Sequence, residues 1–139
     1  MPDLARLVPL GASAARELVV THELTVQHAY PSLPPVYATP QMIFALEMAA
    51  ADAIAALLPS GWGSVGTRVE VSHLAATPVG MRVRAEARVV EVGARHVRFA
   101  CTAHDAHEII GEGWHERAPV ELARFVEGVA RKTAGVDRH

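Results

Sequence analysis

Residues 34–58, PPVYATPQMIFALEMAAADAIAALL, decide how this chain folds. Nearly every residue after Pro40 is apolar, yet the run carries the carboxylate of Glu47 near its middle. A threonine followed by a proline favours a helix start, with Thr39 as the N-cap. We therefore predict a helix from Pro40 to Leu58, ended by the turn PSGWG. A helix that is apolar nearly all round must be surrounded by other elements.

The chain after this helix alternates between apolar and polar residues, as half-buried strands do. Four strands are expected there, preceded by one before the helix; the segments are 64–78, 80–92, 96–105, 108–122 and 16–24. In the first of the four, one face is expected to carry Val65, Thr67, Val69, Val71 and His73, and the other Gly66, Arg68, Glu70 and Ser72. Strands linked by short turns predict one antiparallel sheet. An α+β domain in which such a sheet wraps around one long central helix has the hot-dog fold.

The length of 139 residues predicts a single domain over 1–139. Residues 1–15 are expected to form a loosely ordered lead-in, and 123–139 a closing helix or tail. Segment 27–40 contains four prolines, which predicts a loop that acts as a lid. Half of the residues are hydrophobic, and the sheet edges are bare. These features favour a homodimer, with a tetramer as the larger alternative.

Composition excludes several classes of partner. The net charge of −2 gives no excess of positive charge with which the chain could bind nucleic acid. No apolar run is long enough to span a membrane, and the first residues do not resemble a signal peptide. The single cysteine, Cys101, excludes an intramolecular disulfide and fits a reducing compartment. We therefore expect a cytoplasmic protein.

Three residues are candidates for chemistry. Glu47 interrupts an apolar stripe, where an unpaired charge is costly, so it either faces solvent or an arginine or serves as a functional carboxylate in a cleft. Thr39 has a structural interpretation as the N-cap, but its hydroxyl also lies near free N–H donors that favour negative charge. His73 falls on the apolar face of its strand, where it is either a core residue or a base oriented by a carboxylate.

A metal site is not expected. Cys101, His104 and His107 lie close together in the sequence, but their spacing matches no zinc pattern with a fourth ligand.

Three segments carry a resemblance to a known family: VYATPQMIFALE (36–47), GSVGTRVEVSHLAATPVGM (63–81) and HDAHEIIGEGWHERAPV (104–120). Together they resemble the fluoroacetyl-CoA thioesterase group of the hot-dog superfamily, in the same order, from about His22 to Lys132. The resemblance implies hydrolysis of an acyl-CoA to a free acid and CoA. Coenzyme A is then part of the substrate, and no cofactor is expected.

The resemblance also implies a set of site residues. The family's catalytic threonine, glutamate and histidine match Thr39, Glu47 and His73. The glycine of its GT motif matches Gly66, and a glycine within a strand permits a ligand to approach the backbone closely. The arginine of HERA matches Arg117, in a region associated with substrate contact; alternatively, Arg117 pairs with a neighbouring carboxylate such as Glu116 or Glu121.

The chain departs from the family in the lid. Fluoroacetyl-specific members have a longer span there with phenylalanines, whereas this chain has only YPSLPPVY, which offers Tyr30 and Tyr37. Tyr37 is therefore the expected substrate contact, and little preference for fluoroacetyl-CoA over acetyl-CoA is expected. The threonine is also followed by Pro40, where the family has glycine.

Spacing raises a geometric question about Thr39 and Glu47. Eight residues of a regular helix span roughly 12 Å, so the two side chains cannot hydrogen-bond directly. The chain could bend before the helix, the two residues could come from different protomers, or His73 could lie between them.

Several alternatives follow from the residues alone. The mechanism is either attack by Thr39 assisted by His73 or direct attack by water, with Glu47 or His73 as the base. The alternative functions are a hot-dog hydratase or dehydratase and a non-catalytic acyl-CoA-binding module.

Overall fold

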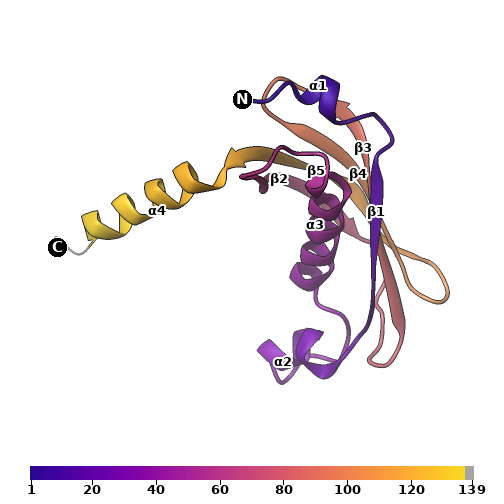
Figure 1. The fold of residues 1–139 in the computed structure, drawn as a ribbon. Helices are drawn as coiled ribbons and strands as arrows, with labels where there is room; N and C mark the ends of the chain where they lie inside the picture. Colours follow the sequence, from indigo (N-terminus) through magenta and orange to yellow (C-terminus); the bar gives the residue numbers. More distant parts are fainter. Residues whose placement is uncertain (137–139) are drawn as a thin grey trace.

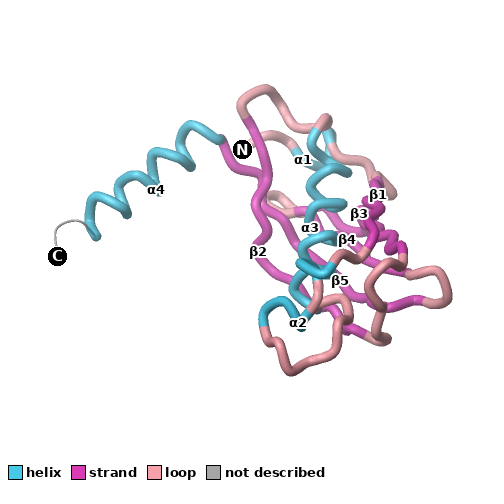
Figure 2. Tube along the Cα trace, turned by 90° about the horizontal axis from the view of Figure 1, so that it is seen from below, coloured by secondary structure: helices cyan, strands magenta, loops and turns pink. Residues whose placement is uncertain are grey.

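The computed structural model of the chain describes residues 1–136; the last three residues of the expected tail lie outside the described part. Its regular elements are one five-stranded antiparallel sheet, the long helix α3 packed against one face of it, and three further helices (Figures 1 and 2). In chain order they are α1 Leu4–Leu7, β1 Ser13–Val19, the 3-10 turn η1 His22–Leu24, α2 Val26–Ala29, α3 Thr39–Ala55, β2 Trp62–His73, β3 Arg82–Val92, β4 Val97–His104, β5 Ile109–Glu121 and α4 Leu122–Val136. The curled sheet with α3 packed against it confirms the predicted hot-dog fold.

The order of strands across the sheet is β1-β3-β4-β5-β2. β3, β4 and β5 are neighbours joined by hairpins, as predicted. β2 and β3 do not form a hairpin. β2 lies at one edge of the sheet, paired with β5, so the connection from β2 to β3 must cross to the opposite edge of the sheet, where β3 lies beside β1. The expectation of a continuous hairpin run was therefore wrong at this step. Alternation predicts strands but does not tell which edges pair.

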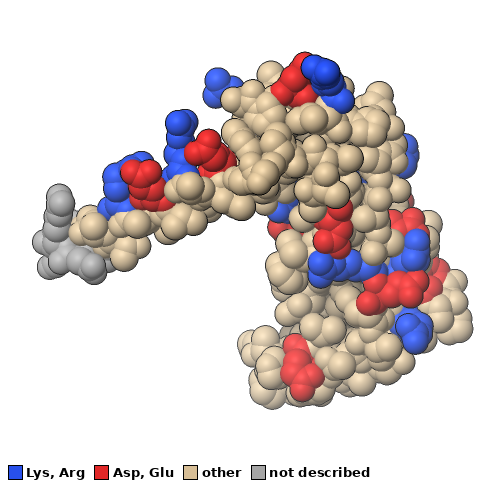
Figure 3. Space-filling model, viewed as in Figure 1, with Lys and Arg blue, Asp and Glu red and all other residues tan. Residues whose placement is uncertain are grey.

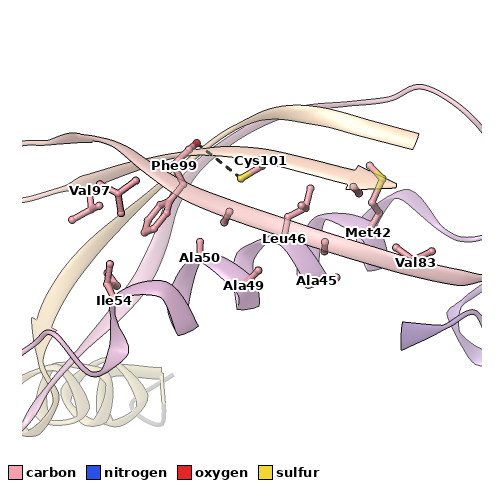
Figure 4. Close-up of a cluster of buried hydrophobic side chains, with 14 of the residues drawn as sticks. Met42, Ala45, Leu46, Ala49, Ala50, Ile54, Val83, Val97, Phe99 and Cys101 are labelled. Atoms are coloured by element: carbon pink, nitrogen blue, oxygen red, sulfur yellow. Dashed lines mark hydrogen bonds between the residues drawn. The ribbon is translucent and has the colours of Figure 1, made fainter. Parts of the chain in front are cut away.

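The core lies between α3 and the concave face of the sheet (Figure 4). Small residues on α3, Ala45, Ala49 and Ala50, allow the helix to approach the strands closely, and Met42, Leu46 and Ile54 fill the space between them. β4 confirms the predicted alternation, because every second residue is buried: Val97, Phe99, Cys101 and Ala103.

One side of α3 is not covered. Phe44 is 56% exposed, and its neighbours on that side, Ile43, Met48 and Ala51, are only partly buried. The sheet thus covers only part of the helix, and the expectation that α3 is surrounded does not hold within one chain. Val69, on the free edge strand β2, is also 43% exposed.

The two ends of the chain differ from expectation. Residues 1–15 were expected to be loosely ordered, but they contain α1 and the first residues of β1, and Leu4 and Val8 are each only 1% exposed. Burial of these two apolar side chains orders the segment. At the other end the expected closing helix is present as α4.

α4 projects away from the rest of the molecule (Figure 1). Its charged side chains gather along one side, while the other is uncharged (Figure 3). Four large apolar side chains of α4 are exposed: Leu122, Phe125, Val126 and Val129. No helix among the described residues is both long and apolar enough to cross a membrane.

Candidate active site

Thr39 lies inside α3, as its first residue, and not before it. The N-cap is Ala38, and no side chain caps the helix. The prediction that Thr39 is the N-cap was therefore wrong, because the threonine hydroxyl has another partner. Thr39 Oγ1 lies 2.7 Å from Nδ1 of His73, the last residue of β2. A hydroxyl and an imidazole at this distance form the nucleophile and base arrangement that acyl transfer requires.

The environment of His73 suits a base. Partial burial lowers its pKa below the ordinary value of 6.5, and the backbone of Ala75 acts in the opposite direction. The ring is therefore neutral at pH 7, and a neutral Nδ1 can accept the proton of Thr39. The other ring nitrogen, Nε2, is buried and has no hydrogen-bond partner among the described residues.

Glu47 lies two turns further along α3, in a second group of polar side chains. A Cβ placed on Gly66 would lie 3.1 Å from Glu47 Oε2, 3.0 Å from His115 Cε1 and 3.5 Å from an Arg117 nitrogen. Gly66 is therefore the point where the other three side chains meet, and its missing side chain leaves room for them. We call Glu47, Gly66, His115 and Arg117 the Glu47 cluster.

A β-bulge places Gly66 in this cluster. Strict alternation puts Gly66 on the face opposite His73, but the register of β2 against β5 shifts between Gly66 and Arg68. The extra residue, Thr67, donates its hydroxyl to the Glu116 carbonyl instead of continuing the alternation. Gly66 and His73 consequently both face α3. The prediction that they lie on opposite faces of the strand was therefore wrong, because strict alternation holds only from residue 68 onward.

Arg117 is 4% exposed and bound on several sides. Its Nε donates to Ser64 Oγ and a terminal nitrogen donates to the Ser64 carbonyl, both at 2.8 Å. The other terminal nitrogen lies 3.4 Å from the Glu47 carbonyl oxygen. Burial lowers the pKa of Arg117, and the nearby charge of Glu47 opposes that shift. The alternative of pairing with Glu116 is wrong, because Glu116 binds Arg98 at 2.7 Å.

Sequence reasoning missed His115, which is 1% exposed and lies at the centre of the cluster. Its Nδ1 is 2.7 Å from the Arg68 carbonyl oxygen, and its Nε2 is 3.2 Å from an Arg117 nitrogen. Burial lowers its pKa, with a further contribution from the charge of Arg117, against the opposing effect of the Arg68 carbonyl. A signal was present: His115 and Arg117 are two residues apart on one strand and must share a face.

Tyr37 lies in the core and not on an open surface. It is 1% exposed, and its hydroxyl donates to the Gln41 carbonyl at 3.2 Å. Burial raises its pKa to about 12. Within a single chain this side chain does not reach the surface, whereas Tyr30 and Leu33 of the lid segment are exposed.

The cysteine and histidines considered as metal ligands are held apart by other contacts. Cys101 is buried in the core, where burial raises its pKa to about 12. His104 lies 3.6 Å from Glu86, and the His107 backbone binds Asp105. A different group, Glu91, His96 and Glu116, brings three possible ligand atoms together. Arg98 contacts both of its carboxylates, and its positive charge occupies the place of a cation.

The structure thus brings Thr39 to His73 and brings Glu47 to Gly66 and Arg117, as two separate groups on α3. Because the helix is regular from Thr39 onward, the chain does not bend between Thr39 and Glu47. Hollows of about 520 Å³ and 530 Å³ lie beside α4 and on the outer face of the sheet, respectively. Neither hollow borders Thr39, Glu47 or His73.

The fold matches hot-dog proteins of the thioesterase superfamily. A hypothetical protein of Thermus thermophilus, described as a thioesterase superfamily member, is 31% identical with a TM-score of 0.89, covering 95% of this chain and 98% of its own. The fluoroacetyl-CoA thioesterase FlK is 37% identical with a TM-score of 0.84, covering 90% and 97% of the two chains.

The family follows from the sequence match. Residues 20–123 match the family model of the fluoroacetyl-CoA-specific thioesterase. The fluoroacetyl-CoA thioesterase of Streptantibioticus cattleyicolor is 38% identical over 130 residues, 89% of this chain and 94% of that protein. The chain belongs to this thioesterase family and is a thioester hydrolase.

Proposed function

We propose that this protein hydrolyses small acyl-CoA thioesters to the free acid and CoA, at a site shared between two copies of the chain. The observation that carries the proposal is the 2.7 Å contact between Thr39 Oγ1 and His73 Nδ1. A base must lie within hydrogen-bond reach of the proton that it removes, and this pair meets that requirement without rearrangement.

The proposed reaction has two steps. His73 Nδ1 takes the proton of Thr39 as Oγ1 attacks the thioester carbonyl carbon, and the imidazolium returns the proton to the departing CoA sulfur. Water, deprotonated by His73, then attacks the Thr39 ester, and the acid leaves as Thr39 recovers its proton. At the start of α3, Pro40 has no N–H, and the N–H groups of Gln41 and Met42 donate to the Ala38 carbonyl oxygen. The proposal therefore assigns the negative charge that develops on the thioester carbonyl oxygen to the Thr39 N–H and the positive end of the helix dipole.

Glu47 is proposed to act on the site of the neighbouring copy. Along one helix it is roughly 12 Å from Thr39, too far to join the pair. The uncovered side of α3 around Phe44 and the free edge of β2 provide the apolar surface and unpaired backbone that a second copy would cover. A homodimer through these surfaces supplies Glu47 of the partner subunit to each Thr39–His73 pair.

Small acyl groups are proposed because the lid segment is short. It exposes one aromatic side chain, Tyr30, and carries no phenylalanine. The chain should therefore distinguish fluoroacetyl-CoA from acetyl-CoA only weakly, although the relative from Streptantibioticus cattleyicolor is named for the fluorinated substrate.

A hydrolysis screen over acyl-CoAs of increasing length, with free CoA detected, tests the activity. We expect the highest kcat/KM for short chains, similar values for acetyl-CoA and fluoroacetyl-CoA, and a loss of about 10²–10⁴-fold in His73→Ala. The exposed His107→Ala is the matched control and should retain full activity. Absence of hydrolysis across the panel would refute the proposal.

Mixing two inactive variants tests the shared site. Thr39→Val and Glu47→Gln chains, co-refolded in equal amounts, form mixed dimers in which one of the two sites has both native residues. Random pairing then restores about a quarter of wild-type activity. If each site lies within one chain, mixing restores nothing, and a monomer in light scattering would also exclude a shared site.

A further inference from the structure

Each of the three nitrogens of Arg117 makes a contact with a group other than the Glu47 carboxylate. Two of its nitrogens bind Ser64, and the third lies 3.2 Å from His115 Nε2 and 3.4 Å from the Glu47 backbone carbonyl oxygen. No ion pair among the described residues joins Arg117 to the Glu47 side chain. This is unusual, since a half-buried carboxylate beside a buried guanidinium would ordinarily pair with it through two hydrogen bonds.

The contacts of His115 permit one protonation state. Nδ1 faces the Arg68 carbonyl oxygen, which can only accept, so Nδ1 carries the hydrogen. Nε2 faces a guanidinium nitrogen, which can only donate, so Nε2 carries the lone pair. The β-bulge at Gly66–Arg68 disturbs the ladder there, and the Arg68 carbonyl accepts the ring N–H.

We propose that His115 is a positioning residue that holds the Arg117 guanidinium away from the Glu47 carboxylate and so keeps Glu47 available for the thioesterase reaction. The inference rests on the proposed function, because it assigns His115 a role through Glu47. Without an acceptor at Nε2, the third nitrogen of Arg117 is free to turn toward Oε2. The carboxylate would then be neutralised in a buried ion pair.

Two substitutions of His115 separate this role from a purely structural one. His115→Asn keeps a donor near the place of Nδ1, for the Arg68 carbonyl, but has nothing at the place of Nε2. His115→Gln puts an amide oxygen near the place of Nε2, for Arg117, but loses the bond to Arg68. Each variant therefore preserves one of the two contacts.

We expect His115→Asn to lower kcat about tenfold or more and His115→Gln to keep kcat within about threefold of wild type, each measured per folded molecule. A purely structural histidine would lower the melting temperature of both variants and leave kcat per folded molecule unchanged. Equal kcat in the two variants, or a lower kcat in the Gln variant, would overturn the proposal.

Nitrogen NMR of the imidazole provides a readout that needs no substrate. The expected spectrum of the wild-type protein shows His115 neutral at pH 7, with the hydrogen on Nδ1 and none on Nε2. Hydrogen on Nε2 would refute the assignment even if His115→Asn failed to fold. If the wild-type protein hydrolyses no acyl-CoA, the proposed function fails, and this spectrum still decides whether His115 accepts from Arg117.

Discussion

The Thr39–His73 pair and the Glu47 cluster lie on the same helix but are built in opposite ways. Thr39 is exposed, and its pair consists of two side chains with one direct contact. In the Glu47 cluster, His115 and Arg117 are buried and hydrogen-bonded to each other and to the neighbouring strand. The Glu47 carboxylate beside them has no hydrogen-bond or ion-pair partner among the described residues. Under the proposed function, the first group carries out the reaction, the second presents a negative charge, and a second copy of the chain joins the two groups.

Thr39→Val tests the reactive group and should have the largest effect. Valine has nearly the same shape but no hydroxyl, and Thr39 makes no capping bond that would be lost. We expect turnover to fall about 10³-fold or more while the melting temperature stays close to wild type. Thr133→Val on the exposed helix α4 is the matched control and should leave turnover unchanged. Near-normal turnover in Thr39→Val would favour direct attack by water.

Glu47→Gln tests the presented charge. The amide keeps the size of the side chain and removes its charge, so a folded protein with turnover lowered about 10²-fold is expected. Asp52→Asn, further along α3, removes a charge that pairs with Arg16 on the surface. That control should change turnover little and stability by less than about 1 kcal/mol. Equal effects of the two substitutions would show that Glu47 is only a surface charge.

Gly66→Ala tests the crowding in the Glu47 cluster. The added Cβ would lie 3.0 Å from the His115 ring and 3.1 Å from Glu47 Oε2, so both must shift slightly. We expect a stability loss of roughly 1 kcal/mol and a severalfold fall in turnover. A Cβ added at Gly128 in α4 would lie 3.8 Å from an Arg131 side-chain nitrogen, an ordinary contact, so Gly128→Ala should stabilise its helix slightly. Denaturant unfolding and turnover measured on both variants test this prediction. Unchanged stability and turnover in Gly66→Ala would show that the Glu47 cluster has room for the added methyl group.

The pH dependence of stability should show the smallest effect. Burial lowers the pKa of both His73 and His115 below 6.5. As the pH falls through 6.5 toward those lowered values, the unfolded chain binds protons that the folded chain does not, so stability decreases. We expect the melting temperature to fall between pH 7 and pH 5, and to fall less in His115→Gln. An unchanged slope in that variant would assign the effect to His73 alone.

Much of the fold could be predicted because the apolar residues that become buried recur at a regular spacing along a strand or helix. The alternation identified β3 and β4 as half-buried strands, and the apolar run after Pro40 identified α3. This spacing does not tell which strands pair with each other, so the sequence did not show that β2 lies beside β5. Nor did alternation reveal the bulge at Thr67, which moves Gly66 onto the face of the helix.

The residues Thr39, Glu47 and His73 could be singled out from the sequence, because each breaks a local pattern. Thr39 is a hydroxyl at the start of an apolar helix, Glu47 is a charge inside that helix, and His73 is a polar side chain on an apolar strand face. Only the tertiary structure decided how they are grouped. The partner of Thr39 is 34 residues away and Arg117 is 70 residues from Glu47, so strand pairing and the packing of α3 on the sheet determine both contacts. His115 became visible for the same reason: its role depends on a carbonyl and a guanidinium that local sequence cannot bring together.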